Sequence, residues 1–232
     1  MKPLMIDMFC GLGGWAEGGR AAGYDVVGFD IERHEYGDQR YPAQMVIQDV
    51  LTLDGAQFRD AALILASPPC QEFSYMAMPW SRAKQIARAL RGEDEFPDGY
   101  KGSRTIAELT ALFDACFRIQ REASAAAGRH IPMVVENVKG AQPWVGRARW
   151  NYGSYYLWGD VPALMPMTVG GRHGCFRDSA GIKQQGSGRE WFAGEGKISR
   201  MTSSGSPARK AASAMIAKIP FDLARHVAQV YS

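Results

Sequence analysis

Residues 3–14 read PLMIDMFCGLGG, an apolar run that leads directly into three glycines. The run at 3–9 predicts a buried strand, and the glycines predict a tight turn whose backbone can approach a ligand closely. Residues 15–22 then predict a helix that ends at Gly23 and offers free amides in its first turn. A strand, a glycine turn and a helix are typical of the first unit of a nucleotide-binding α/β fold. A plain turn is the alternative for the glycines taken alone.

Each of the next two predicted strands leads into an acidic residue. Residues 24–29 predict the second strand, which runs into Asp30, and residues 44–48 predict a short third strand followed by Asp49. An acid about twenty residues beyond the glycine turn, at the tip of the second strand, can accept hydrogen bonds from a ribose. We assign this role to Asp30. Glu32 is the competing carboxylate, and a solvated loop charge is the alternative.

A cysteine follows the apolar run AALILA at residues 61–66, in the sequence SPPCQ at residues 67–71. The run predicts a buried strand, so Cys70 lies at a strand's carboxyl end, where open α/β sheets bind ligands. Two successive prolines stiffen the turn that presents the thiol. Cys70 is therefore a candidate nucleophile, although a small buried apolar side chain is the alternative for a cysteine considered by itself.

The middle of the chain predicts a loop, a long helix and a fifth strand. Residues 76–104 read as a long loop shortly after Cys70, and a long loop just after a nucleophile predicts a lid, with an ordinary solvated helix at 80–90 as the alternative. Apolar residues at helical spacing predict a long amphipathic helix over 104–128, which makes Cys116 structural. Residues 130–135 predict the fifth strand.

Four motifs together resemble those of the cytosine-carbon-5 DNA methyltransferases, and they occur in that family's order. Residues 7–14 resemble its cofactor loop, residues 67–74 its Pro-Cys-Gln nucleophile motif, Glu136-Asn137-Val138 its Glu-Asn-Val motif, and Arg147-Ala148-Arg149 its pair of arginines. The resemblance covers about residues 1–160 well and the C-terminal tail faintly.

The sequence departs from the family pattern at two places. Val145 stands where the family has a glutamine, two positions before the first arginine. The family's asparagine before a Val/Ile-Pro turn is also missing, because Ala217 or Lys218 stands there. Its contact with the cofactor must therefore be lost or replaced.

The resemblance implies one catalytic α/β domain. Its sheet would be a doubly wound, mostly parallel, Rossmann-like sheet of the S-adenosylmethionine-dependent methyltransferase type, with a small target-recognition insertion. We expect the catalytic domain at 1–159, the basic recognition segment at 160–210, and a C-terminal helix at 211–232 that returns to the catalytic domain.

The implied cofactor is S-adenosylmethionine, since the glycines do not have the Gly-x-Gly-x-x-Gly spacing of a dinucleotide site. In the family, the acid after the third strand binds the adenine amino group, and Asp49 with the Val50 backbone matches that position. The expected cofactor-binding residues are Phe9, Gly11, Leu12, Gly13, Gly14, Asp30, Ile31, Asp49, Val50 and Pro68.

The family's reaction gives each catalytic position a role. Carbon 5 of cytosine is a poor nucleophile until a thiolate, here that of Cys70, adds to carbon 6. Glu136 would hold ring nitrogen 3 and the exocyclic amine, for which it must be protonated part of the time. Arg149 matches the arginine that contacts the base's carbonyl oxygen, and Arg147 would support the active site.

Double-stranded DNA is the expected partner, with the cytosine flipped out of the helix so that carbon 6 can be reached. Residues 168–210 hold eight Lys/Arg against three Asp/Glu, which suits a nucleic-acid surface, with a disordered or merely soluble loop as the alternative. A phage or prophage enzyme that protects DNA from restriction would suit so compact a chain. Two other functions stay open: an RNA cytosine methyltransferase with the same site, and an inactive module that binds the cofactor or DNA.

Composition agrees with an enzyme of this kind. The chain has 232 residues, 46% hydrophobic and 22% charged, with a net charge of +3. Its four cysteines lack metal-ligand spacing, so we expect no metal and no disulfide framework. We expect no membrane span, a cytoplasmic location in a bacterium or a phage-infected cell, and a monomer.

Overall fold

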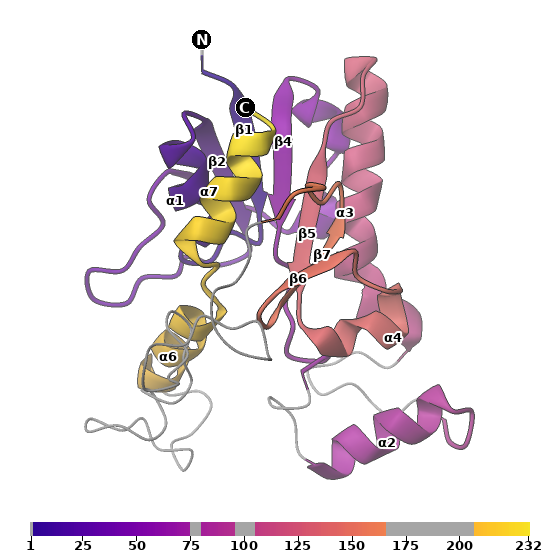
Figure 1. Ribbon diagram of the computed structural model, residues 1–232. Helices are drawn as coiled ribbons and strands as arrows, with labels where there is room; N and C mark the ends of the chain where they lie inside the picture. The colour runs from indigo at the N-terminus through magenta and orange to yellow at the C-terminus, as the bar shows by residue number, and fades with distance from the viewer. Residues whose placement is uncertain (1, 75–79, 96–104, 166–206) are drawn as a thin grey trace.

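A computed structural model describes residues 2–74, 80–95, 105–165 and 207–232. Seven strands form one sheet in the order β3-β2-β1-β4-β5-β7-β6 (Figure 1). The first five strands in sequence run parallel to one another, and β7 runs antiparallel to both of its neighbours. The predicted α/β fold with a mostly parallel, Rossmann-like sheet is therefore confirmed. The strands are β1 (Leu4–Met8), β2 (Asp25–Asp30), β3 (Gln44–Ile47), β4 (Ala61–Ala66), β5 (Met133–Asn137), β6 (Trp150–Tyr152) and β7 (Tyr155–Gly159).

Helices cover both faces of this sheet. Figure 1 shows α1 (Gly14–Ala21) and α7 (Phe221–Val230) over one face and α3 (Ile106–Ala127) over the other. The strand order reverses between β1 and β4, and ligands of open α/β sheets bind at such a switch point, outside the carboxyl ends of the strands. The remaining helices are α2 (Trp80–Leu90), α4 (Gln142–Val145) and α6 (Pro207–Ala217), with 3₁₀ turns η1 (Val50–Thr52), η2 (Gly55–Phe58) and η3 (Lys139–Ala141).

The core has two halves, one on each side of the sheet. Leu63 and Leu65 of β4 pack with Trp15 of α1 on one side, and Ile64 packs with Phe113 of α3 on the other. Successive side chains of a strand point to opposite faces, so a central strand must be apolar throughout. This is the physical reason for the continuous apolar run at 61–66.

Helix α3 agrees with the helix predicted over 104–128. The Thr105 hydroxyl accepts a hydrogen bond from the Glu108 amide and the Glu108 carboxylate accepts one from the Thr105 amide, which is a capping box. Gly128 ends the helix in the left-handed conformation. Cys116 is fully buried against the sheet, so its predicted structural role agrees with its position.

The fifth strand differs from the prediction. It begins at Met133 and ends at Asn137, so Glu136 and Asn137 lie in the strand and not beyond it. The cause is a later segment: Glu136 pairs with Leu157 and Asn137 with Tyr156 of the antiparallel strand β7. Local sequence does not contain that pairing.

The C-terminal segment also differs from a single predicted helix. It forms two helices, α6 and α7, separated by Lys218, Ile219 and Pro220. Helix α6 begins inside the segment expected to recognise the target, whose residues 166–206 lie outside the described residues. The predicted domain boundaries therefore stay a prediction. Helix α2 lies within the predicted lid, where the alternative was a helix at 80–90, and residues 75–79 and 96–104 of that lid are not described.

No helix in the described parts of the chain is both long enough and apolar enough to cross a membrane.

Candidate active site at the carboxyl edge of the sheet

Parallel pairing brings the predicted site residues to one edge of the sheet. Residues 9–14 follow β1, Asp30 ends β2, Asp49 follows β3, Cys70 follows β4 and Glu136 is the next-to-last residue of β5. Since parallel strands have their carboxyl ends on the same side, these residues share an edge although up to 127 positions separate them.

The glycine loop is held in an unusual backbone conformation. Phe9 has a φ of 57°, the only positive φ at a residue other than glycine in the described part of the chain, and Gly11 and Gly13 have φ values of 49° and 79°. A phenylalanine in the left-handed region costs on the order of 1–3 kcal/mol, so the surrounding structure must hold it there. A Cβ at Gly11 would have no atom within 4 Å, so the loop is open at that point, whereas Leu12 is buried.

Asp30 joins this loop to the second strand. Its Oδ2 accepts a hydrogen bond from the Gly11 amide at 2.9 Å, and its Oδ1 accepts from the Ile31 amide at 2.8 Å. Burial raises the pKa of Asp30, but hydrogen bonds from His34 and from the amides of Gly11 and Glu32 outweigh burial and lower its pKa overall. Asp30 is therefore ionised, and Glu32, the competing carboxylate, is exposed to solvent.

Ile31 and the turn after β3 also lie at this edge of the sheet. Ile31 is 69% exposed, which leaves an apolar surface next to the carboxylate of Asp30. After β3, the Asp49 Oδ1 accepts from the Leu51 amide at 2.9 Å, and Val50 is buried. Arg118 of α3 fixes this turn, because its guanidinium donates to the carbonyl of Leu53 at 2.9 Å.

Asp7 is a functional candidate that the sequence reasoning missed. This carboxyl in the middle of β1 is fully buried, and burial raises its pKa well above its usual range, although a hydrogen bond from Tyr41 opposes the shift. The Tyr41 hydroxyl donates to Asp7 Oδ2 at 3.2 Å, and the Tyr41 ring lies where a Cβ of Gly28 would be, 2.5 Å from the hydroxyl oxygen. The sequence signal for this candidate is an acidic residue inside the apolar run at 3–9.

The turn that carries Cys70 is fixed from three sides. The Ser67 amide donates to the carbonyl of Met8, and Trp15 Nε1 donates to the Ser67 hydroxyl at 2.9 Å. Asn137 Nδ2 donates to the carbonyl of Pro68 at 2.9 Å. Asn137 therefore connects the Cys70 turn to β5, a role that sequence reasoning did not assign to it.

The thiol of Cys70 lies near the carboxyl of Glu136. Burial, then the negative charge of Glu136, raises the pKa of Cys70 to about 11. Cys70 is partly exposed and Glu136 is buried. Cys10 and Cys116, by contrast, are buried, and burial raises the pKa of both thiols far above the usual range. Among the three cysteines that the structure describes, Cys70 is the one that solvent and a substrate can reach.

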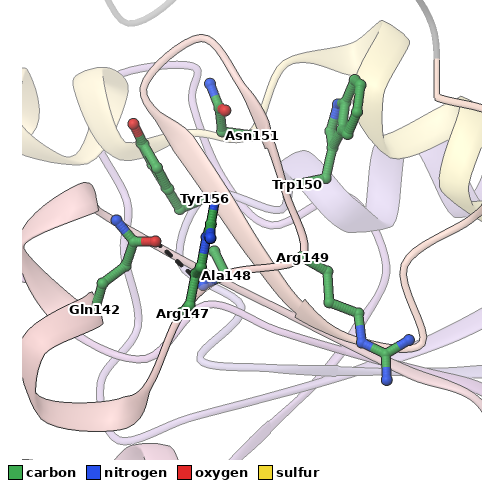
Figure 2. A pocket seen from close by; sticks show the side chains of 7 residues that line it. All are labelled: Gln142, Arg147, Ala148, Arg149, Trp150, Asn151 and Tyr156. Carbon is green, nitrogen blue, oxygen red and sulfur yellow. Dashed lines mark hydrogen bonds between the residues drawn. The ribbon is translucent and has the colours of Figure 1, made fainter.

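The two arginines lie in the wall of a cavity of about 440 Å³ beside the β6–β7 hairpin (Figure 2). Gln142 Oε1 accepts from the Ala148 amide at 3.2 Å, so a glutamine three positions before Val145 fixes the segment between the arginines. In Figure 2 the Arg149 side chain extends away from Gln142 and Tyr156. The cavity is lined by Gln142, Arg147, Ala148, Arg149, Trp150, Asn151 and Tyr156.

The register between β5 and β7 determines from which face of the sheet Glu136 and Tyr156 project. Glu136 pairs with Leu157, and Tyr156 is the next residue of β7, so Glu136 and Tyr156 project from opposite faces. Arg149, whose amide donates to the carbonyl of Leu157 at 2.8 Å, lies at the level of Glu136.

Among the described residues there is no group of three or more His, Cys, Asp and Glu side chains that could hold a metal ion.

Comparisons with known proteins agree with the two N-terminal motifs, the glycine loop and the turn of Cys70. Residues 4–82 match the model of the C-5 cytosine-specific DNA methylase family. The type II methyltransferase M.DdeI of Desulfomicrobium norvegicum is 33% identical over 79 residues, which are 30% of this chain and 19% of that protein. The chain thus spans about a fifth of the length of this relative. The resemblance to the family that the sequence predicted is confirmed over this N-terminal part.

Solved structures with some similarity include three methyltransferases. A putative DNA modification methyltransferase from an Escherichia coli prophage is 20% identical and covers 60% of this chain and 33% of its own, with a TM-score of 0.34. The Dnmt2 methyltransferase of S. pombe is 15% identical, covers 61% and 36%, and has a TM-score of 0.34. The methyltransferase EhMeth of Entamoeba histolytica is 16% identical, covers 62% and 41%, and has the same TM-score of 0.34.

Proposed function

Because residues 4–82 match the C-5 cytosine-specific DNA methylases, we propose that this chain transfers a methyl group from S-adenosylmethionine to carbon 5 of a flipped-out cytosine in double-stranded DNA. The observation that carries the proposal is the pairing of a reachable thiol, Cys70, with the buried carboxyl of Glu136 beside a glycine loop. The proposal includes a protective role against restriction, as for a phage or prophage enzyme.

The residues of the edge fit the proposed cofactor. The loop is open at Gly11, Asp30 is ionised for a ribose, and the exposed Ile31 offers an apolar surface for an adenine. Asp49 would accept from the adenine amino group, and Phe9, Leu12, Gly13, Gly14, Val50 and Pro68 would complete the site. S-adenosylmethionine, when bound, supplies a methyl group on a positively charged sulfur.

In the proposed reaction the Cys70 thiol loses its proton to solvent, and its sulfur bonds to carbon 6 of cytosine while the electron pair of the ring's 5,6 double bond moves into the ring. Glu136, protonated, donates to ring nitrogen 3 and neutralises the charge that enters the ring, while Arg149 holds the carbonyl oxygen and Arg147 supports the segment. After carbon 5 is methylated, its proton leaves to a base and the Cys70 sulfur departs, which restores the double bond.

The raised pKa of Cys70 suggests how the nucleophile is switched on. With a pKa of about 11 the thiol is protonated at neutral pH in the free protein. When Glu136 takes up a proton to bind the base, its negative charge no longer raises the pKa of Cys70. Base binding would therefore lower the pKa of Cys70, although burial, the larger cause of the raised pKa, would remain.

Alkylation rates test this coupling directly. Glu136→Gln removes the carboxylate charge, so the pKa of Cys70 should fall and iodoacetamide should modify it roughly 3- to 10-fold faster at pH 8. In the unchanged protein the rate should keep rising with pH toward about 11. Mass spectrometry of the Cys70 peptide, in a Cys175→Ser background, measures both.

Glu32→Gln is the matched control, because this exposed carboxylate lies next to Asp30 and should leave the rate at Cys70 unchanged. Equal rates for Glu136→Gln and the control would show that Glu136 does not control the thiol.

Calorimetry tests the cofactor site. Asp30→Ala or Asp49→Ala should weaken S-adenosylmethionine binding by roughly 1–3 kcal/mol each, the usual loss when a charged hydrogen-bond partner is removed. Asp25→Ala, at the amino end of β2, is the control and should leave affinity unchanged. Unchanged affinity in both Asp30→Ala and Asp49→Ala would show that these carboxylates do not bind the cofactor.

The decisive experiment for the function compares methyl transfer to matched DNA and RNA duplexes, together with bisulfite sequencing of plasmid from expressing cells. Methylation of DNA at cytosine carbon 5 is the expected result. Transfer to RNA alone would establish the RNA methyltransferase instead, and no transfer to either would favour an inactive binding module.

A further inference from the structure

The C-terminal segment lies directly on the first helix, and two glycines make this possible. A Cβ at Gly14 would be 2.5 Å from the Ile219 nitrogen and 2.6 Å from its oxygen. One turn further along α1, a Cβ at Gly18 would be 2.5 Å from the Cβ of Ala224 in α7. The backbone of Ile219 therefore contacts Gly14 at the end of the glycine loop, 205 positions earlier in the chain.

One ion pair holds the two segments together at this point. Lys218 Nζ lies 2.6 Å from Glu17 Oε1, and the Lys218 side chain is only 9% exposed. Glu17 belongs to the first turn of α1, and its amide donates to the carbonyl of Gly13 at 2.9 Å. No side chain caps this helix. Glu17 is the acidic residue of its first turn, where a negative charge interacts favourably with the helix dipole.

Lys218 is held from a second side by the β6–β7 hairpin. The Tyr155 hydroxyl donates to the carbonyl of Lys218 at 3.3 Å. Tyr155 pairs with Tyr152, and the same hairpin begins at Trp150, directly after Arg149. Lys218 thus touches both the helix that continues the glycine loop and the hairpin that follows the arginines.

We infer that Lys218 is a positioning residue for the cofactor loop: its ion pair with Glu17 fixes the first turn of α1 and so the backbone of Gly11 to Gly14. This inference rests on the proposed function for the identity of the ligand. Loss of the lysine would leave Glu17 half-buried without its cation, beside amides that the ligand needs. Cys70 and Glu136 are untouched, so chemistry should suffer less than binding.

Two measurements on Lys218→Met test the inference. Calorimetry should show S-adenosylmethionine binding weakened roughly 10-fold, with KM for the cofactor raised similarly and kcat within about threefold of the unchanged protein. Amide hydrogen exchange without ligand should become faster at residues 11–17. This second readout does not depend on the identity of the cofactor.

Further variants separate positioning from general destabilisation. Glu17→Gln should weaken binding as Lys218→Met does, and the double variant should lose less than the sum of the two, because the partners act as one unit. Asp222→Asn is the matched control: it removes an exposed ion pair of α7 and should change neither binding nor exchange at 11–17.

Each failure has its own signature. If the unchanged protein does not bind S-adenosylmethionine, the proposed function fails, while the exchange experiment still tests the lysine. If Lys218→Met and Glu17→Gln leave binding within twofold and exchange at 11–17 unchanged, Lys218 is not a positioning residue. A loss spread evenly over all helices would equally overturn the inference, because it would indicate general destabilisation.

Discussion

Cys70→Ala will abolish methyl transfer, by at least about 10³-fold, while the protein stays folded and binds its cofactor. The reason is chemical: without addition of sulfur to carbon 6, carbon 5 of cytosine is not reactive enough to accept a methyl group. Loss of the thiol should leave the fold intact, since hydrogen bonds to the backbone of Ser67 and Pro68 hold the turn. Transfer of a radioactive methyl group to DNA measures the loss.

DNA that contains 5-fluorocytosine should trap the unchanged protein covalently, because fluorine cannot leave carbon 5 as a proton does. Cys10→Ala is the matched control, since Cys10 is buried beside the glycine loop and should retain both turnover and trapping. Detectable turnover by Cys70→Ala, or an adduct mapped to Cys10, would contradict the assignment of the nucleophile.

Gly18→Ala should cost about 2–4 kcal/mol of the free energy of unfolding. Alanine normally stabilises a helix relative to glycine by roughly 0.5–1 kcal/mol. Here the added Cβ would lie 2.5 Å from the Cβ of Ala224 and closer still to the neighbouring backbone, so α7 must move away from α1. Urea unfolding followed by circular dichroism measures the loss.

Gly128→Ala is the comparison, because it isolates the conformational cost of a methyl group from the steric cost. Gly128 has a φ of 64° and open space around its Cβ position, so the change should cost only about 1 kcal/mol. If Gly18→Ala proves as mild as Gly128→Ala, the close packing of the C-terminal helix on α1 is wrong.

The strands and helices that follow a local pattern could be predicted from the sequence. The apolar run before the glycines became β1, the run at 61–66 became β4 residue for residue, and the helical spacing over 104–128 became α3. These segments are specified locally, because apolar periodicity and capping residues act within a few positions of the chain.

That the candidate site residues lie at one edge of the sheet could be predicted from the sequence, but the shifts of their pKa values could not. Asp30, Cys70 and Glu136 stand at strand ends in the sequence, and parallel pairing brings them to one edge. The raised pKa values of Cys70 and Asp7 depend first on burial, and the hydrogen bond that opposes the shift at Asp7 comes from Tyr41, 34 positions away. Local sequence does not contain those partners.

The sequence by itself determined the α/β class, the glycine loop and the turn that carries Cys70, because each follows from residues that are neighbours along the chain. The tertiary structure alone decided that β5 extends through Asn137, that Asn137 holds the Cys70 turn, and that Lys218 pairs with Glu17. Each of these contacts joins residues that are 19 to 201 positions apart. Bringing such distant residues together costs loop-closure entropy. Only the packing of the complete core, with the sheet and its two helical layers formed, offsets that cost.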